Sequence, residues 1–316
     1  MTGNKHQASS KPGADICSVA LRSMPPFRGK VRVTDALARI ASITGGGWGT
    51  CALGTGATLR VNLSDRIERQ MWGGCYEPHV QGALRAWLAP GNTFVDIGAH
   101  VGYHAVLGAS LVGSRGRVFA FEADPGNFAR LADHLRPFSW ATAMNVAVWS
   151  TTGKVIFERS SEPGESGWGT VAAVRDLAKG KHFSIDTISL DDWSQQNGIE
   201  NVSVMKVDAE GSEVSILQGA RNFLQRAKPA IIIEANDVVL RQANSSALEL
   251  TEILRGEGYE LFELVGTTLR PFRDADSSGS SELLAVPMER SEAILARLRQ
   301  SGFQVVGRPL NQAGPQ

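Results

Sequence analysis

The sequence predicts an α/β protein built on a doubly wound, mostly parallel β-sheet with helices on both faces. From residue 93 onward, short apolar runs alternate with stretches of helical periodicity, which is the pattern of βαβ units. The composition is that of a globular chain, with 42% hydrophobic and 20% charged residues, and it excludes collagen-like, coiled-coil and wholly disordered classes. The length of 316 residues suggests two domains of about 150 residues, and a single α/β domain with elaborations fits equally well.

Seven apolar runs are the expected strands of this sheet. They are Thr93–Ile97, Arg117–Glu122, Ala143–Val148, Val202–Asp208, Ala230–Glu234, Tyr259–Leu264 and Glu282–Val286. The helices expected between them are Val101–Val112, Pro125–Leu135, Ser212–Leu224 and Ala247–Gly256. Asp124 and Pro125 suit the N-cap and the first position of the second of these helices. The Gly/Ser-rich segment at 160–180 shows no period and is expected to be an insertion or lid near the site.

The region before the sheet predicts a helix and a hairpin. Thr34–Ile43 has helical spacing, and two β-type runs follow at Thr50–Leu53 and Thr58–Leu63. The glycines between these runs fit a hairpin better than a phosphate loop, because no GxxxxGK[ST] motif follows. The expected organisation is a flexible tail at 1–30, a helix and hairpin extension at 31–90, the α/β domain at 91–290, and a C-terminal helix and tail at 291–316.

Charge and cysteine usage limit the partners and the compartment. Lys plus Arg and Asp plus Glu both number 32, so no net charge attracts a nucleic acid. The three cysteines lack a CxxC pairing and predict neither a disulfide framework nor a zinc ribbon, which favours a cytoplasmic location. The lack of an 18-residue apolar stretch and of a signal sequence predicts no membrane partner. The extra hairpin makes a homodimer conceivable.

The first strand of the sheet ends in a glycine turn that suits a cofactor. Asp96 stands just before the turn, and Gly98 and Gly102 let the backbone pass close to a ligand before a helix begins. The Gly-x-x-x-Gly spacing differs from that of dinucleotide-binding folds, so a nicotinamide dehydrogenase is not expected. A carboxylate here repels pyrophosphate but suits a ligand with an ammonium and a sulfonium group. S-adenosylmethionine carries both and is the predicted cofactor, with S-adenosylhomocysteine as product.

Two further strand ends complete the predicted nucleoside site. Glu122 lies 24 residues beyond Gly98, near the position at which an acidic residue accepts the ribose hydroxyls in βαβ nucleoside sites. The turn after the second strand and the end of the third are expected to bracket the adenine ring. The predicted cofactor-binding residues are Asp96, Gly98, Ala99, His100, Gly102, Tyr103, Glu122, Ala123, Asp124, Asn145, Val146 and Ala147.

At these positions the sequence resembles the FkbM-type methyltransferases of the class I, S-adenosylmethionine-dependent group. The motifs that carry the resemblance, over about residues 70–290, are Gly74–Pro78, Val95–Tyr103, Phe121–Pro125, Leu190–Trp193, Lys206–Glu213 and Ile233–Glu234. The resemblance implies the Rossmann-like class I methyltransferase fold with a seven-stranded, mostly parallel sheet. It also implies methyl transfer to a hydroxyl or amine of a small-molecule natural product or sugar, such as an aminoglycoside or polyketide in antibiotic biosynthesis. His100, where the family often has Asn, and Trp168 depart from the pattern, which leaves the acceptor open.

Methyl transfer needs an acceptor held in line and a route by which its proton leaves. Asp208, by analogy with the family, is the first candidate for orienting the acceptor or taking its proton, and Glu210 and Glu234 come next. Glu213 is expected to be a first-turn helix acid, and Lys206 is either a salt-bridge partner of these acids or a functional group. The residues expected to contact the acceptor are Tyr76, Glu77, His79, His104 and Trp168, although packing is the preferred interpretation of His104.

Several alternatives stay open at this point. Asp208, Glu234 and Asn236 could form an oxygen-rich magnesium site, although metal-free transfer is preferred. The surplus of acids near the strand ends could attract a cationic acceptor, or could simply be solvated. A nucleic-acid methyltransferase is disfavoured because Pro25-Pro26-Phe27 follows Met24 rather than an acid or Asn, and precedes the fold. A non-catalytic nucleoside-binding or assembly module is the alternative from another class.

Overall fold

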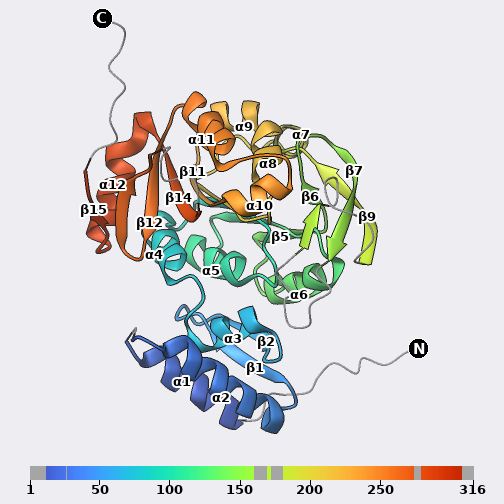
Figure 1. The fold of residues 1–316 in the computed structure, drawn as a ribbon, viewed down its shortest axis with the longest axis vertical. Coiled ribbons are helices and arrows are strands. Elements are labelled where there is room, and N and C mark those ends of the chain that lie inside the picture. Colours follow the sequence, from blue (N-terminus) through green and yellow to red (C-terminus); the bar gives the residue numbers. More distant parts are fainter. Residues whose placement is uncertain (1–11, 26, 160–168, 172–180, 274–278, 308–316) are drawn as a thin grey trace, which may run out of the picture. The chain divides into compact units, whose positions relative to one another are not determined.

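The computed structural model describes residues 12–25, 27–159, 169–171, 181–273 and 279–307. The chain divides into two compact units (Figure 1). The first unit runs to Pro78 and the second begins at His79, so the second starts earlier than the predicted boundary at residue 91.

The N-terminal unit consists of helices beside a hairpin. Its elements are α1 (Pro12–Ser23), α2 (Lys30–Gly45), β1 (Trp48–Ala52), β2 (Thr58–Asn62) and α3 (Arg66–Gly73). β1 and β2 pair antiparallel, as the sequence predicts. The sequence predicts a flexible tail where the structure has α1. This helix is held against its unit because Leu21 is buried and because the hydroxyl of Ser18 donates to the carbonyl of Trp72 at 2.7 Å.

The second unit is built on a nine-stranded sheet. From one edge to the other the strands are β15, β13, β12, β14, β11, β10, β3, β4 and β5. Their bounds are Thr93–Ile97 (β3), Arg117–Phe121 (β4), Ala141–Met144 (β5), Val204–Val207 (β10), Ala230–Asn236 (β11), Tyr259–Val265 (β12), Thr268–Pro271 (β13), Ser280–Pro287 (β14) and Gln304–Val305 (β15). β5, β4, β3, β10 and β11 run parallel, and β14 inserts antiparallel between β11 and β12. The predicted count of seven is thus exceeded, because the short strands β13 and β15 extend one edge.

Helices cover both faces of this sheet (Figure 1). α4 (Pro78–Trp87), α5 (Tyr103–Val112) and α6 (Pro125–Leu135) lie along one face, and α7 (Leu190–Asn197), α8 (Glu213–Gln218), α9 (Arg221–Ala227) and α11 (Ala247–Gly256) lie along the other. Two more helices, α10 (Asp237–Gln242) and α12 (Ser291–Gln300), follow β11 and β14 along the chain. The central strands are almost wholly apolar and buried, as expected for parallel strands between two helical layers. Across the described residues, every helix is too short or too polar to cross a bilayer.

A smaller four-stranded sheet follows the main one along the chain, and the sequence analysis missed it. Its strands, in the order β6, β9, β7, β8, are β6 (Ala147–Val148), β9 (Lys181–Ile188), β7 (Gly153–Arg159) and β8 (Gly169–Val171). The run predicted as one strand at Ala143–Val148 is split: β5 ends at Met144, and β6 belongs to the second sheet. Most of the segment predicted as a lid lies outside the described residues, apart from β8.

Candidate active site

The glycine turn between β3 and α5 brings three strand ends together. The amides of Gly98 and Ala99 both donate to the carbonyl of Phe121, at 3.0 and 2.9 Å, so the turn is fastened to the end of β4. Gly98 has a φ of +77°, and a Cβ built on it lies 1.8 Å from the carbonyl oxygen of Asp208. Only glycine permits this approach, so the turn after β10 packs directly against the turn after β3.

Glu122 connects the turns that follow β3 and β4. Its two carboxylate oxygens accept hydrogen bonds from the backbone amides of His100 (2.8 Å) and Asp124 (2.9 Å). Burial raises the pKa of Glu122 to about 7, and these amides offset part of the rise. His100 has a positive φ of 51°, a conformation that Asn and His tolerate better than most residues. The departure from the family's usual Asn is therefore compatible with the backbone at this position.

The carboxylate of Asp96 is buried without a hydrogen-bond partner among the described residues. Asp96 lies within β3, and neither of its oxygens meets hydrogen-bond geometry with any described group. Its pKa is raised to about 6, chiefly by burial; Lys206 and the nearby amide of Ala105 oppose the rise, and Asp208 adds to it. A buried carboxylate without donors costs free energy unless a ligand supplies them.

Lys206 is a buried cation at the centre of the site. It lies beside Asp96 in the pairing of β10 with β3, and its Nζ contacts Oδ2 of Asp208 at 2.7 Å. Asp208 follows the end of β10, where its amide donates to the carbonyl of Ile97 at 3.1 Å. Of the two roles predicted for Lys206, the structure shows that of an ion-pair partner, here with Asp208.

Three glutamates surround Asp208 at the ends of β10 and β11. Glu210 has a positive φ of 48°, and burial, followed by the charges of Asp208 and Glu234, raises its pKa to about 9. Burial also raises the pKa of Glu234, whose Oε1 accepts a hydrogen bond from Ser280 at 3.1 Å. Glu213 begins α8 and its Oε1 accepts from the amide of Ala209 at 2.8 Å, while burial raises its pKa to about 8. Glu213 therefore fastens the turn, in line with its predicted structural role.

These carboxyl groups make the stability of the unliganded protein depend on pH. The pKa values of Asp96, Glu122, Glu213 and Glu210 are about 6, 7, 8 and 9, above those of the same groups in an unfolded chain. The folded state therefore holds more protons, so the stability involved is complete below about pH 4 and is lost as the pH rises through about 6 to 9. We expect the thermal midpoint of the unliganded protein to fall by roughly 5 °C or more over that range.

The variant Glu210→Gln tests whether the carboxyl groups of the site cause the fall of the thermal midpoint with rising pH. It removes the group with the highest of these pKa values, so its midpoint should decline less steeply than that of the wild type between about pH 7 and 9. Glu200→Gln, at an exposed position, is the matched control and should follow the wild-type profile. A midpoint that rises with pH, or a Glu210→Gln profile identical to the wild type, would contradict this description of the site.

The adenine-bracketing residues lie where β5 gives way to β6. Nδ2 of Asn145 donates to the carbonyls of Glu122 and Ala123, at 2.9 and 3.1 Å, which holds the ends of β4 and β5 together. Asp124 caps α6 through hydrogen bonds from the amides of residues 126 and 127, so its side chain has a structural role there. The assignments of these residues to the cofactor, with Val146 and Ala147, stay predictions.

The residues predicted to contact the acceptor are divided between the two units. Tyr76 and Glu77 belong to the N-terminal unit, and Trp168 lies outside the described residues. His104 is buried on α5, and burial, with the charges of Lys206 and His79, holds its pKa well below the ordinary value. Burial also lowers the pKa of His79. A histidine as hard to protonate as His104 stays neutral near pH 7, so it adds no positive charge to the site.

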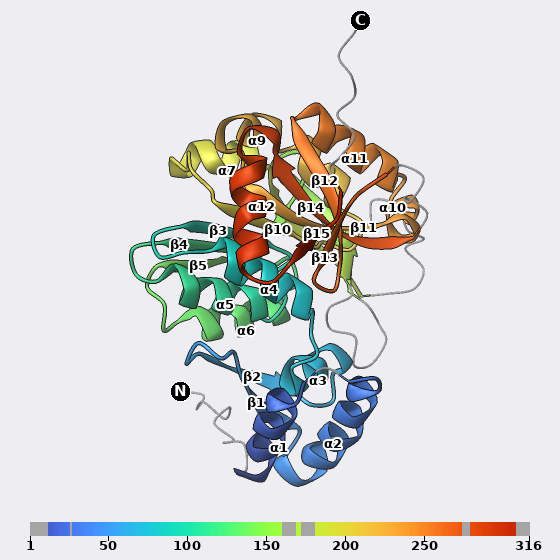
Figure 2. The same ribbon diagram turned by 90° about the vertical axis from the view of Figure 1, so that its left-hand side faces the viewer.

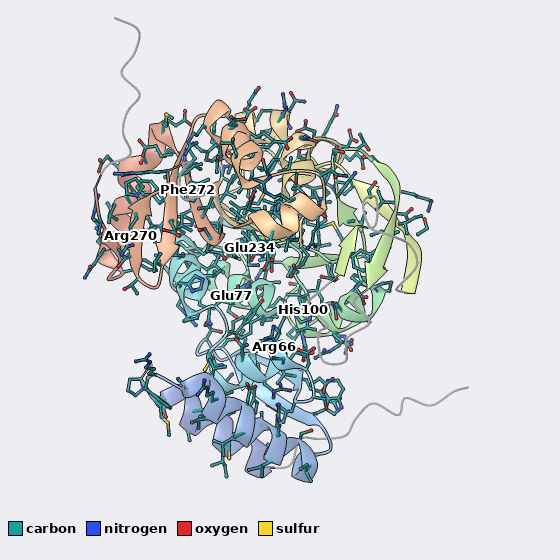
Figure 3. The ribbon with its side chains drawn as sticks, in the orientation of Figure 1. Arg66, Glu77, His100, Glu234, Arg270 and Phe272 are labelled. Carbon is teal, nitrogen blue, oxygen red and sulfur yellow. The ribbon has the colours of Figure 1, made fainter. Side chains whose placement is uncertain are left out.

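His100 and Glu234, labelled in Figure 3, both lie at the carboxyl end of the parallel strands. Ser280, which donates to Glu234, was not found from the sequence. It lies in β14, whose antiparallel insertion beside β11 brings together segments 46 residues apart. No local pattern marks such a pairing, so only the sheet order reveals it.

Within the described residues, no three His, Cys, Asp or Glu side chains are arranged to hold one metal ion. The magnesium alternative also involves the amide side chain of Asn236, and it stays a hypothesis. Asn236 itself caps α10, since its Oδ1 accepts from the amide of Val239 at 3.4 Å.

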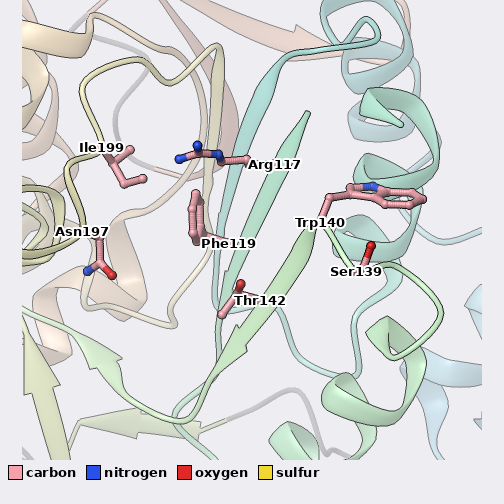
Figure 4. Close-up of a pocket in the computed structure, with 7 residues that line it drawn as sticks. All are labelled: Arg117, Phe119, Ser139, Trp140, Thr142, Asn197 and Ile199. Carbon is pink, nitrogen blue, oxygen red and sulfur yellow. The ribbon is translucent and has the colours of Figure 1, made fainter. Parts of the chain in front are cut away.

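One cavity of about 320 Å³ lies away from these residues (Figure 4). It is lined by Arg117, Phe119, Ser139, Trp140, Thr142, Asn197 and Ile199. Arg117 and Ala141 are the first residues of β4 and β5, so the cavity lies toward the amino ends of these strands. Its lining contains none of the predicted site residues.

The fold and the site together define an α/β enzyme of the Rossmann-like class, with acidic residues at or near the carboxyl ends of β3, β4, β10 and β11. Residues 96–261 match the family model described as the methyltransferase FkbM domain, and the chain belongs to this family of methyltransferases. The matched segment includes every predicted cofactor-binding and catalytic residue. The predicted fold class and family are therefore confirmed.

Two curated relatives are methyltransferases. The hexuronic acid methyltransferase AglP of Haloferax volcanii is 28% identical over 174 residues, which cover 52% of this chain and 67% of the relative. The 2-O-methyltransferase NoeI of Sinorhizobium fredii is 24% identical over 187 residues, 56% of this chain and 74% of the relative. Among solved structures, the methyltransferase FkbM of Methylobacillus flagellatus matches with a TM-score of 0.40 and 20% identity, over 69% of this chain and 54% of that one. The chain thus matches about half the length of that solved protein.

Proposed function

We propose that the protein is an S-adenosylmethionine-dependent O-methyltransferase whose acceptor is a hydroxyl group of a sugar or of a sugar-containing natural product. Family membership supports methyl transfer, and the names of the two relatives, one specifying a hexuronic acid and the other a 2-O position, support a sugar hydroxyl. We further propose a cytoplasmic location, which the three free cysteines support. An amine acceptor, as in an aminoglycoside, and a polyketide hydroxyl are the alternatives.

The residues at the strand ends fit a cationic nucleoside cofactor. Asp96 offers a buried carboxylate near the amide of Ala105, and Gly98, just after β3, lets the turn after β10 pack directly against the turn after β3. Glu122 already accepts two amide hydrogen bonds and interacts with the side chain of Asn127, which leaves at least one carboxylate lone pair for a ribose hydroxyl. Except for Lys206, the charged groups gathered at the strand ends are carboxyl groups, so a ligand with a sulfonium and an ammonium group relieves their repulsion.

S-adenosylmethionine, when bound, supplies an electrophilic methyl group. Asp208 accepts the proton of the acceptor hydroxyl, and its side chain, 23% exposed, can pass that proton to solvent. Lys206 holds the carboxylate of Asp208 in place through the 2.7 Å contact. Glu210, with a pKa of about 9, is protonated near neutral pH and can donate a hydrogen bond that orients the acceptor oxygen.

The observation that carries this proposal is the buried carboxylate of Asp96 beside the glycine turn. The test is transfer of a labelled methyl group from S-adenosylmethionine to hexuronic-acid oligosaccharides, with mass spectrometry locating the methylated atom. A methyl ether on one sugar hydroxyl is the expected product. Transfer to an amine alone would replace the proposed acceptor class. Cofactor binding without transfer to any hydroxyl or amine would favour a non-catalytic module.

A further inference from the structure

The outward faces of α1 and α2 expose large apolar side chains. Ile16 and Val19 on α1 are 69% and 63% exposed, and Ile40 and Ile43 on α2 are 60% and 86% exposed. The two helices lie side by side within the N-terminal unit (Figures 1 and 2). Because both pack against β1 and α3 through their buried faces, the exposed side chains point away from the core of this unit.

The apolar residues of α2 form a continuous stripe. Val33, Ala36, Ile40 and Ile43 follow one another at intervals of three, four and three residues, which places them on one side of a helix. The buried residues Thr34, Ala38 and Ala41 lie on the opposite side. The helix therefore has a core-facing side and a second apolar stripe that its own unit leaves exposed.

Cations flank this stripe. Arg32 and Arg39 are exposed next to it, and Arg28 is exposed just before the helix. The only acid of α2, Asp35, is already neutralised by Arg69 at 2.8 Å. Residues 1–45 carry seven Lys and Arg against two Asp and no Glu, although the whole chain balances 32 against 32. Among the described residues of this positively charged stretch, Arg28, Arg32 and Arg39 are exposed beside or just before the apolar stripe.

We propose that this surface, made by Ile16, Val19, Val33, Ile40 and Ile43 with Arg28, Arg32 and Arg39, docks on an anionic lipid bilayer. Apolar side chains that enter the interface, with cations beside them that contact anionic headgroups, are the two elements of peripheral membrane helices. A nucleic acid would use the cations but gain little from exposed isoleucines. A second copy of this chain would bring the same cations together, and their repulsion opposes pairing.

This inference goes beyond the proposed function and reverses the expectation of no membrane partner. That expectation rests on the absence of a spanning segment, whereas a surface helix needs only one apolar side. Docking of this kind would place the methyltransferase at a membrane without inserting it.

The test is co-sedimentation of the full-length protein with vesicles. Phosphatidylcholine vesicles are compared with an equimolar mixture of phosphatidylcholine and phosphatidylglycerol. The expected result is binding to the mixed vesicles at least about tenfold stronger than to phosphatidylcholine, weakened by added salt. The double variants Ile40→Ser/Ile43→Ser and Arg32→Gln/Arg39→Gln should each weaken it by about tenfold or more.

The matched control is Val238→Ser/Leu248→Ser, which removes two exposed apolar side chains from the other unit and should leave vesicle binding unchanged. All three variants change exposed positions, and unaltered thermal midpoints and methyl transfer to a soluble acceptor show that they fold. Equal binding to both vesicle types, no binding to either, or binding that neither double variant weakens overturns the proposal. A dimer in solution that Ile40→Ser/Ile43→Ser dissociates also overturns it and assigns the surface to a second copy.

Discussion

Asp208→Asn is expected to lower kcat by about 10²- to 10⁴-fold while leaving the affinity for S-adenosylmethionine within a few fold of the wild type. The substitution keeps the size of the side chain and removes the carboxylate that accepts the acceptor's proton. Asp208 is proposed to contact the acceptor and not the cofactor. The variant should therefore lose turnover and keep its affinity for S-adenosylmethionine.

The surroundings of Asp208 support its proposed role as the base. Glu210 has a pKa of about 9 and holds its proton at neutral pH, so it is a poor proton acceptor there. Asp208 is held by a buried lysine and is partly exposed, so it combines a fixed position with a path to solvent. Asp208→Asn leaves Lys206 buried with one fewer counter-charge, which can lower the stability of the protein. The thermal midpoint of the variant is therefore measured together with its kcat.

Asp186→Asn is the matched control for this variant. Asp186 also forms a carboxylate–lysine pair, with Lys154, but both side chains are exposed and lie on the smaller sheet. Turnover of this control should equal that of the wild type. Asp208→Asn that binds the cofactor, melts as a folded protein and retains full kcat would remove Asp208 from the chemistry.

The central strands, and the acidic residues gathered at their ends, could be predicted from the sequence because both depend on local patterns. β3, β4, β10 and β11 are short, mostly apolar runs, and each is followed directly by a glycine or an acidic residue. In a parallel sheet the carboxyl ends meet at one edge, so Asp96, Glu122 and Asp208 could be expected there together. The backbone contact that allows this, Gly98 against Asp208, is consistent with the glycine turn.

The features of the fold and the site that the sequence did not predict depend on pairings between distant segments. The second sheet was missed because β7 and β9 are separated by a segment without a period, and their register joins Gly153 to Thr187. β14 pairs with β11 only after a long excursion of the chain, so the hydrogen bond from Ser280 to Glu234 has no local signal. Protonation states are equally non-local, since burial dominates the raised pKa of Glu210 and depends on the whole packed structure.

Asp96→Asn is expected to weaken the binding of S-adenosylmethionine by about 10- to 100-fold in calorimetry. The amide keeps the shape of the side chain but removes the negative charge and replaces one acceptor with a donor. In the wild type the affinity should rise as the pH increases through about 6, because the carboxylate that favours a cation forms there. The variant should lack this component of the pH dependence.

The thermal midpoint of Asp96→Asn shows whether its weaker cofactor binding comes from the lost charge or from a failure to fold. Ionisation of buried Asp96 destabilises the unliganded protein above about pH 6, since its pKa is raised in the folded state. Asp96→Asn removes that ionisation, so the thermal midpoint of the unliganded variant at about pH 8 should equal or exceed that of the wild type. Asp133→Asn, which changes an exposed carboxylate on α6, should alter neither property.

The combination of unchanged or higher stability with lost affinity is specific to a carboxylate kept for a ligand. A structural carboxylate would show the opposite pattern, because its removal would lower the midpoint. A variant that binds the cofactor as tightly as the wild type would show that the charge of Asp96 is not used in binding. The buried, unbonded position of this group would then need another cause, and the proposed cofactor site would lose its main support.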